Sequence, residues 1–198
     1  MIVLAAFVLV VLAGGGCVAG RYNSMVNNQE TVDQRFSDID NQYKRRNDMI
    51  PQLVATVKGS ADFEKTVLTD VTEARASVGR IQIPAQASSD PRSVEKYLEA
   101  QQGLGAAVGR LLMTTENYPQ LQATAGFRDL QSQLEGTENR IAVARTDYIA
   151  GVKAYNTVLR QFPGNLVAGF FGFERMPQLE PATAAEREVP TIDFSEDQ

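Results

Sequence analysis

The sequence predicts an all-α protein in which one apolar N-terminal helix is followed by an elongated antiparallel helical bundle. Residues 1–20 contain no charged side chain. From Tyr22 to Ile81, alternating steps of three and four residues reach eighteen positions, of which fourteen are apolar or aromatic. The same spacing returns between Phe127 and Phe162. A repeat of 3.5 residues is typical of long helices that pack on other helices, and these repeating sites are called core-facing positions below.

The first segment, residues 1–20, consists of apolar and small side chains. A stretch of this length can just cross a hydrocarbon core about 30 Å thick, so we favour a retained single-pass transmembrane anchor. A lipoprotein signal is an alternative, because Cys17 follows three glycines and would be its lipidation site, although Gly14 stands where such signals carry Leu. A cleaved secretory signal is the third interpretation.

The charges beside this segment bear on its orientation. Arg21 and a basic cluster at residues 44–46 follow it, whereas only the α-amino group precedes it. Because cytoplasmic flanks carry an excess of Lys and Arg, we expect the rest of the chain on the cytoplasmic side of a bacterial inner membrane. Lipidation at Cys17 would instead place it outside.

The stretch from Tyr22 to Ile81 is expected to form one long, bent helical element, because its repeat continues past Pro51 and Gly59. Pro51 lacks an N–H group and crowds the carbonyl four residues earlier, so a kink is expected near Asn47. A break near Pro51 or Gly59 would give four helices rather than three long elements.

Lys44, Arg45 and Arg46 form the one dense basic cluster of the sequence. Its simplest interpretation is a solvated helix face paired with Asp40 and Asp48. Arg46 is the exception, since it falls on a core-facing position, where a charge can fix the register of a bundle or pair across helices.

Gly79 and Pro84 are expected to end the first element, and Asp90 and Pro91 to start the next helix as its N-cap and first residue. That helix should run to about residue 117. It contains glycines at 103, 105 and 109, which weaken an isolated helix by roughly 1 kcal/mol each relative to Ala. We expect them to admit a neighbouring backbone, with a hinge as the alternative.

The last long helix is expected over residues 120–162, ended by the run Phe162-Pro163-Gly164-Asn165. The apolar run at 166–173 then either folds back over the end of the bundle or contacts a bilayer or a partner. Residues 174–198 hold seven acids and two bases, which account for the whole net charge of −5, and this tail is expected to be mostly disordered. The expected domains are thus 1–20, 21–173 and 174–198.

Composition excludes several kinds of chemistry. The chain has no His and one Cys, so Ser or Cys triads built on His, an internal disulfide and a thiolate zinc site are all excluded. Carboxylate pairs such as Asp38 with Asp40 are typical of solvated helix faces. The neutral body offers no basic face for nucleic acid. We therefore expect no enzyme, no cofactor and no metal site.

Seven phrases, in this order, cover nearly everything after residue 20, and with them the chain resembles the LemA family. They are RYNSMV (21–26), DIDNQYKRRNDMIPQLVATVKG (38–59), VTEARA (71–76), TTENYPQLQATAGFRDLQSQLEGTENRIAVARTDY (114–148), AYNTVLRQFP (154–163), FGFE (171–174) and VPTIDF (189–194). The resemblance implies an N-terminal membrane anchor and an antiparallel bundle usually described as four-helix. The family that the chain resembles includes a protein involved in magnetosome membranes and has no accepted enzymatic activity.

The functional expectation is a membrane-anchored interaction or scaffold protein, with unknown protein partners and self-association into a homo-oligomer as one mode. The alternative is an envelope lipoprotein, lipidated at Cys17, that binds a ligand or assists envelope assembly. The candidate interaction residues are the basic cluster, residues near the expected turn, residues of the last helix, and aromatic residues of the apolar run: Lys44, Arg45, Arg46, Asn117, Tyr118, Asn139, Arg140, Phe170, Phe171 and Phe173.

Overall fold

The computed structural model describes residues 1–59, 63–84 and 86–178, apart from the side chains of five residues near the N-terminus. Every regular element in these ranges is an α-helix. In chain order the helices are α1 (Ile2–Lys58), α2 (Lys65–Gly79), α3 (Pro91–Thr115), α4 (Pro119–Gln122), α5 (Ala125–Arg160) and α6 (Gly164–Phe171).

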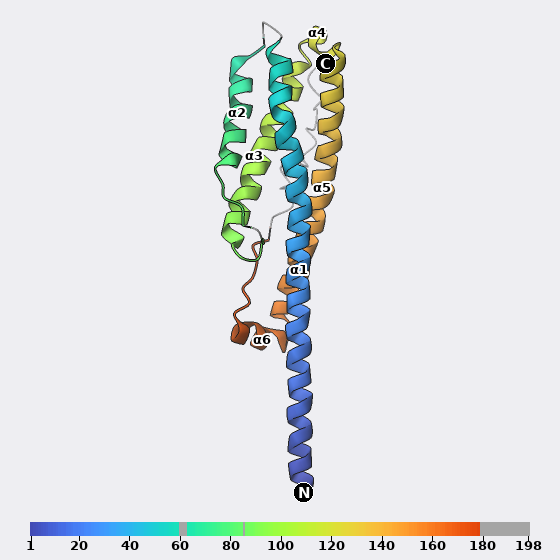
Figure 1. Cartoon of the computed structure of the whole chain (residues 1–198), viewed down its shortest axis with the longest axis vertical. Helices are drawn as coiled ribbons and strands as arrows, with labels where there is room; N and C mark the ends of the chain where they lie inside the picture. Colours follow the sequence, from blue (N-terminus) through green and yellow to red (C-terminus); the bar gives the residue numbers. More distant parts are fainter. Residues whose placement is uncertain (60–62, 85, 179–198) are drawn as a thin grey trace, which may run out of the picture.

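Four of these helices make an up-down-up-down bundle, with α4 at one end and α6 at the other (Figure 1). The helices pack chiefly as two pairs, α1 with α5 and α2 with α3. Short connections between consecutive antiparallel helices are what this topology requires. The expected all-α helical bundle is confirmed.

The expectation of one long element from Tyr22 to Ile81 is wrong. Helix α1 ends at Lys58, and Gly59 caps it by donating its N–H to the carbonyl of Val57. Helix α2 then runs back in the opposite direction (Figure 1). The break near Gly59 therefore gives the four-helix division. The 3.5-residue repeat does not change across the reversal, because both helices face the same core.

Pro51 lies inside α1 without ending it. Its ring nitrogen has no hydrogen to donate to the carbonyl of Asn47. The Nε of Arg75, on α2, donates to that carbonyl instead, at 3.3 Å. A side chain from the neighbouring helix thus replaces the missing helical hydrogen bond, and α1 continues across the proline.

The core-facing positions predicted from the repeat are buried along most of the bundle. On α1 they include Met25, Val32, Ile39, Leu53 and Val57, each with no exposed surface. The predicted positions of α3 are likewise buried, and so are most of those on α5. The prediction that Phe162 faces the core is wrong, because α5 ends at Arg160 and the ring of Phe162 lies beyond that end, 76% exposed.

Side chains cap the starts of α3, as expected, and of α5, which begins at Ala125 rather than at the expected residue 120. Asp90 caps α3 by accepting from the N–H of Ser93 at 3.1 Å and from its hydroxyl at 2.5 Å, with Pro91 as the first residue. These bonds from Ser93 hold the pKa of the Asp90 carboxyl below its usual range. Thr124 caps α5 in the same way, through the N–H of Phe127.

The N-terminal part of α1 projects far beyond the other helices as a bare arm (Figure 1). This arm, residues 2–20, has exposed apolar side chains that include Ile2, Leu4, Phe7 and Leu12. Over the described residues, no helix combines the length and the apolar character that crossing a membrane requires. The expected helix at the N-terminus is therefore present, but the structure does not support its assignment as a transmembrane span.

Helix α6 lies crosswise at the base of the bundle, close to the point where the arm leaves it (Figure 1). The chain then turns back along the bundle, where Met176 is buried in the core. Packing thus continues past the expected boundary at residue 173. Residues 179–198, including the VPTIDF phrase, lie outside the described residues, and the expected disorder of the tail stays a prediction.

Candidate functional site

A chain of polar side chains crosses the centre of the bundle and joins α1, α3 and α5. The Nζ of Lys44 lies 2.6 Å from Asp40 Oδ2. The Tyr97 hydroxyl donates to Asp40 Oδ1 at 2.8 Å, and Gln101 Nε2 donates to that hydroxyl at 2.7 Å. Arg46 continues the chain toward α5. Such a set of directed bonds in an apolar core specifies how the helices align.

Arg46 is the central member of this polar chain and is only 2% exposed. Its Nη2 donates to both the backbone carbonyl and Oε1 of Gln101, at 2.6 and 2.7 Å. Its Nη1 pairs with Glu138 Oε1 at 3.0 Å, and its guanidinium lies 5.2 Å from the centre of the Tyr43 ring. The Glu138 side chain is 41% exposed, so the ion pair opens to solvent on the α5 side.

Gly105 makes room for this guanidinium. A Cβ at residue 105 would lie 2.9 Å from Arg46 Nη1, whereas a Cβ at 103 or 109 would meet nothing within 4 Å. The expectation that these glycines admit a neighbouring backbone is therefore wrong. One of the three admits a buried charged side chain instead.

The buried tyrosines of the core stay protonated far into the alkaline range. Burial raises the pKa of Tyr43 and of Tyr97, and the Asp40 carboxylate that accepts from Tyr97 raises the latter further. Burial also raises the pKa of Tyr148 and of Tyr155, with Asp33 as a second cause. Two of these neutral hydroxyls are donors, from Tyr97 to Asp40 and from Tyr155 to the Glu174 carbonyl.

Two further polar contacts fasten connecting segments to the bundle. Asp33 on α1 accepts from the N–H and the hydroxyl of Ser88, at 2.8 and 2.7 Å, and so holds the α2–α3 loop. Asn156 on α5 forms a two-way pair with the backbone of Met176, donating to its carbonyl at 2.8 Å and accepting from its N–H at 3.1 Å. Tyr155 adds a hydroxyl bond to the Glu174 carbonyl at 3.0 Å.

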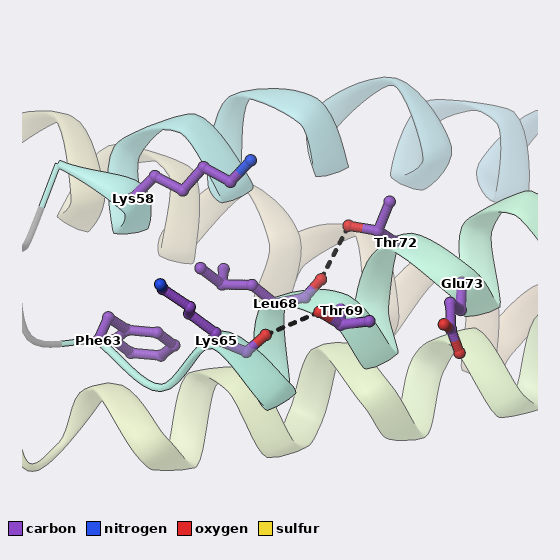
Figure 2. Close-up of a pocket in the computed structure, with 7 residues that line it drawn as sticks. All are labelled: Lys58, Phe63, Lys65, Leu68, Thr69, Thr72 and Glu73. Atoms are coloured by element: carbon purple, nitrogen blue, oxygen red, sulfur yellow. Dashed lines mark hydrogen bonds between the residues drawn. The ribbon is translucent and has the colours of Figure 1, made fainter.

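A hollow of about 600 Å³ lies between the end of α1 and the start of α2 (Figure 2). Leu68 and Phe63 give it an apolar part, and the ammonium groups of Lys58 and Lys65 lie apart from one another around it. The hydroxyls of Thr69 and Thr72 donate to carbonyls of their own helix. The polar groups do not converge on one point, so this hollow has no defined ligand chemistry.

A second groove, about 440 Å³, runs between α1 and α5. It brings together two of the predicted interaction residues, Asn139 and Arg140, with Arg35 and Asp38 from α1. Arg35 also lies 3.6 Å from Asp147 across the two helices. Polar side chains surround this groove while most of its exposed surface is apolar, and such a surface suits contact with a protein.

The base of the bundle carries exposed apolar side chains. Phe170 is 84% exposed and Phe171 about half exposed, while Phe173 is half-buried. The ring of Tyr22 lies 4.9 Å from that of Phe171 and 5.6 Å from that of Phe173, measured between centroids. Three predicted residues thus gather here against the root of the arm.

The other predicted interaction residues are spread along the molecule. Lys44 and Arg45 are exposed on α1, and Lys44 forms the expected pair with Asp40. Asn117 is exposed at the far end of the bundle, and Tyr118 beside it packs its ring 5.0 Å from that of Phe63. Cys17 is exposed on the arm, and its lipidation stays a prediction.

Sequence reasoning missed Gln101 and Glu138 as partners of Arg46, and Tyr97 as the partner of Asp40. A signal was available, because Tyr97, Gln101, Leu104 and Val108 follow one another at core-facing spacing. A glutamine at such a position is the natural partner of a core-facing arginine.

In the described part of the chain, no group of three or more acidic or cysteine side chains is placed to hold a metal ion.

Comparison with known proteins adds relatives to this geometry. The chain is 26% identical to Magnetosome protein MamQ 2 of Paramagnetospirillum magneticum over 93% of its own length and 74% of that protein. It is 24% identical to Magnetosome protein MamQ of Magnetospirillum gryphiswaldense, over 86% and 69%. It is 22% identical to Protein LemA of Metamycoplasma hominis, over 75% and 64%.

A family model extends the match over most of the bundle. Residues 35–194 match the model of the LemA family. This range includes the residues of α1, α3 and α5 that form the central polar chain. The four-helix division agrees with the bundle that the resemblance implies. The chain belongs to the LemA family.

Proposed function

We propose that this protein is held at a membrane by the arm and acts there as an interaction scaffold, without catalysis. The observation that carries the proposal is the arm itself: nineteen residues of helix with no charged side chain, whose described apolar side chains are exposed beyond the end of the bundle. An exposed apolar surface of this extent calls for a bilayer or a partner. Two relatives are named magnetosome proteins, which supports a setting of this kind.

The bundle suits a scaffold because the arm and the body share one helix. Helix α1 runs from Ile2 to Lys58, about 85 Å at the usual helical rise, so the direction of the arm fixes the direction of the bundle. The groove at Asn139 and Arg140 lies between α1 and α5 and is the surface we assign to a protein partner. We propose that the bundle lies on the cytoplasmic side of the membrane.

Flotation of the full-length protein with lipid vesicles tests attachment. The substitutions Phe7→Asp and Leu12→Asp place carboxylates on the arm, where neither side chain supports the bundle. Each carboxylate costs about 3 kcal/mol in a bilayer, so the double variant should partition more weakly by on the order of ten-thousandfold.

The matched control is the double variant Met113→Asp and Val143→Asp, which adds the same charges at similarly exposed apolar sites on α3 and α5. It should float like the wild type. Equal flotation of the arm variant and this control would contradict the attachment proposal.

The scaffold role has a separate test. Site-specific photo-crosslinking from Asn139 in cells should capture a protein, either a second copy of this chain or another, and Asn139 is exposed enough to carry the probe. A probe at Thr69, exposed on α2, is the control position. A strictly monomeric full-length protein that crosslinks to nothing from Asn139 would refute the scaffold role.

A further inference from the structure

We propose that the outer face of α6 rests on the lipid surface of the membrane that the arm enters. The inference rests on the proposed attachment of the arm and adds a second contact of different kind. Helix α6 lies crosswise to α1 at the level where the arm leaves the bundle (Figure 1). A helix in that position lies flat on a surface from which the arm projects.

The two faces of α6 differ sharply. Val167 and Ala168 are buried against the bundle, whereas Leu166 and Phe170 point outward and are exposed. Phe162, four residues before Leu166, is exposed as well, which extends the apolar surface beyond the start of the helix. An apolar outer face with aromatic side chains is what an interfacial helix presents to the headgroup and acyl boundary.

Both ends of α6 are fixed, so the outer face stays exposed. At its start, a Cβ on Gly164 would lie 2.5 Å from the Val158 carbonyl oxygen and 3.1 Å from Met25 Cε, which shows how closely the backbone approaches α5 and α1. At its end, Gly172 adopts a left-handed conformation with φ 75°. The Asn156 pair with Met176 then holds the chain that follows.

Charge around α6 fits a lipid surface. No charged side chain occurs from residue 161 to 173, while Arg160 and Arg175 flank that stretch and Arg21 precedes the ring of Tyr22. Arginine side chains at the rim of an apolar face can reach anionic headgroups, and Glu174 is the acid among them. A second copy of the chain is less suited, because the embedded arm already brings lipid to this level.

Fluorescence from full-length protein with Cys17→Ser tests the inference. An environment-sensitive thiol fluorophore is attached at Leu166→Cys, or at Val143→Cys as the matched exposed apolar control on α5. Vesicles contain phosphatidylcholine and phosphatidylglycerol, with or without bromine on the acyl chains. On vesicles, emission from position 166 should shift to shorter wavelength and be lost with brominated lipid, whereas position 143 should show neither change.

The other outcomes separate the two proposals. If the protein floats with vesicles but position 166 behaves like position 143, the α6 inference is refuted and attachment by the arm stands. If the protein does not float, attachment fails and the α6 inference fails with it. A blue shift at position 166 without lipid that grows with protein concentration means that a second copy covers α6, and refutes the lipid contact.

Discussion

Adding one methyl group at Gly105 should have opposite effects on stability, depending on Arg46. In the wild type, the new Cβ of Gly105→Ala would lie 2.9 Å from Arg46 Nη1, closer than side chains normally approach. The tip of an arginine can usually withdraw at little cost. Here the guanidinium is buried and makes three directed bonds, to Gln101 twice and to Glu138, so withdrawal lengthens all of them.

The magnitudes decide the sign. Ala favours a helix over Gly by about 1 kcal/mol. Overpacking of a filled core costs about 1–3 kcal/mol, and each hydrogen bond to a charged group is worth about 1.5–3 kcal/mol. Gly105→Ala should therefore lower the free energy of unfolding of the wild type by about 1–2 kcal/mol. In an Arg46→Met background the guanidinium is absent, and Gly105→Ala should raise the free energy of unfolding by about 1 kcal/mol.

Urea unfolding, followed by circular dichroism, measures the stability of the full-length wild type, the two single variants Arg46→Met and Gly105→Ala, and the double variant. Gly103→Ala is the control, because the same change two residues away on α3 meets nothing within 4 Å and should stabilise both backgrounds equally. The expected coupling between residues 46 and 105 is about 2–3 kcal/mol. If Gly105→Ala stabilises the wild type as much as Gly103→Ala does, the guanidinium is not held as argued.

Three further predictions rest on other parts of the molecule. The four buried tyrosines, at 43, 97, 148 and 155, keep their protons above pH 10.0, where the unfolded chain releases them, so stability should be full below about pH 10 and fall as pH rises further. Equal urea midpoints at about pH 8 and about pH 11 would contradict this linkage. Asn156→Ala removes both bonds to Met176 and should speed trypsin cleavage after Arg175, whereas Asn165→Ala, at an exposed site on α6, should not; equal rates would show that the pair does not hold this segment. The arm proposal requires residues 1–20 in the mature protein, so mass spectrometry should find peptides from this stretch, and a mature chain that begins at a lipid-modified Cys17 would refute it.

Much of the bundle was predictable, because burial follows one period along every helix. The core-facing residues of α1 and α3, and the capping of α3 by Asp90 before Pro91, are all determined by spacing and local chemistry. The reversal after Gly59 was not. A 3.5-residue repeat reports which face is buried and carries no information on whether the next helix continues or turns back.

The candidate site was less predictable, because its bonds join distant segments. Arg46 could be recognised as a core-facing charge, yet its partners lie 55 and 92 residues further along the chain. The role of Gly105 depends on the exact approach of Arg46, which spacing does not give. The exposure of Phe162 depends on where α5 stops, and helix ends are set by local competition that a repeat does not record.

The polar contacts along α1 explain how a repetitive core keeps a single alignment. A shift of seven residues would place apolar side chains on apolar side chains and cost the core little. Asp33, Asp40 and Arg46 lie about one heptad apart, and each has a different partner on the α3 side: Ser88, Tyr97 and Gln101. A slip by one heptad would set Ile39 or Leu53 where Arg46 meets the acceptor oxygens of Gln101, and would leave the buried guanidinium without them. That penalty fixes α1 relative to α3, and through the Tyr22 contact it fixes the height of α6 at the root of the arm. An attachment that depends on both the arm and α6 needs this fixed height, because a displaced α6 would be lifted from the surface or driven into it.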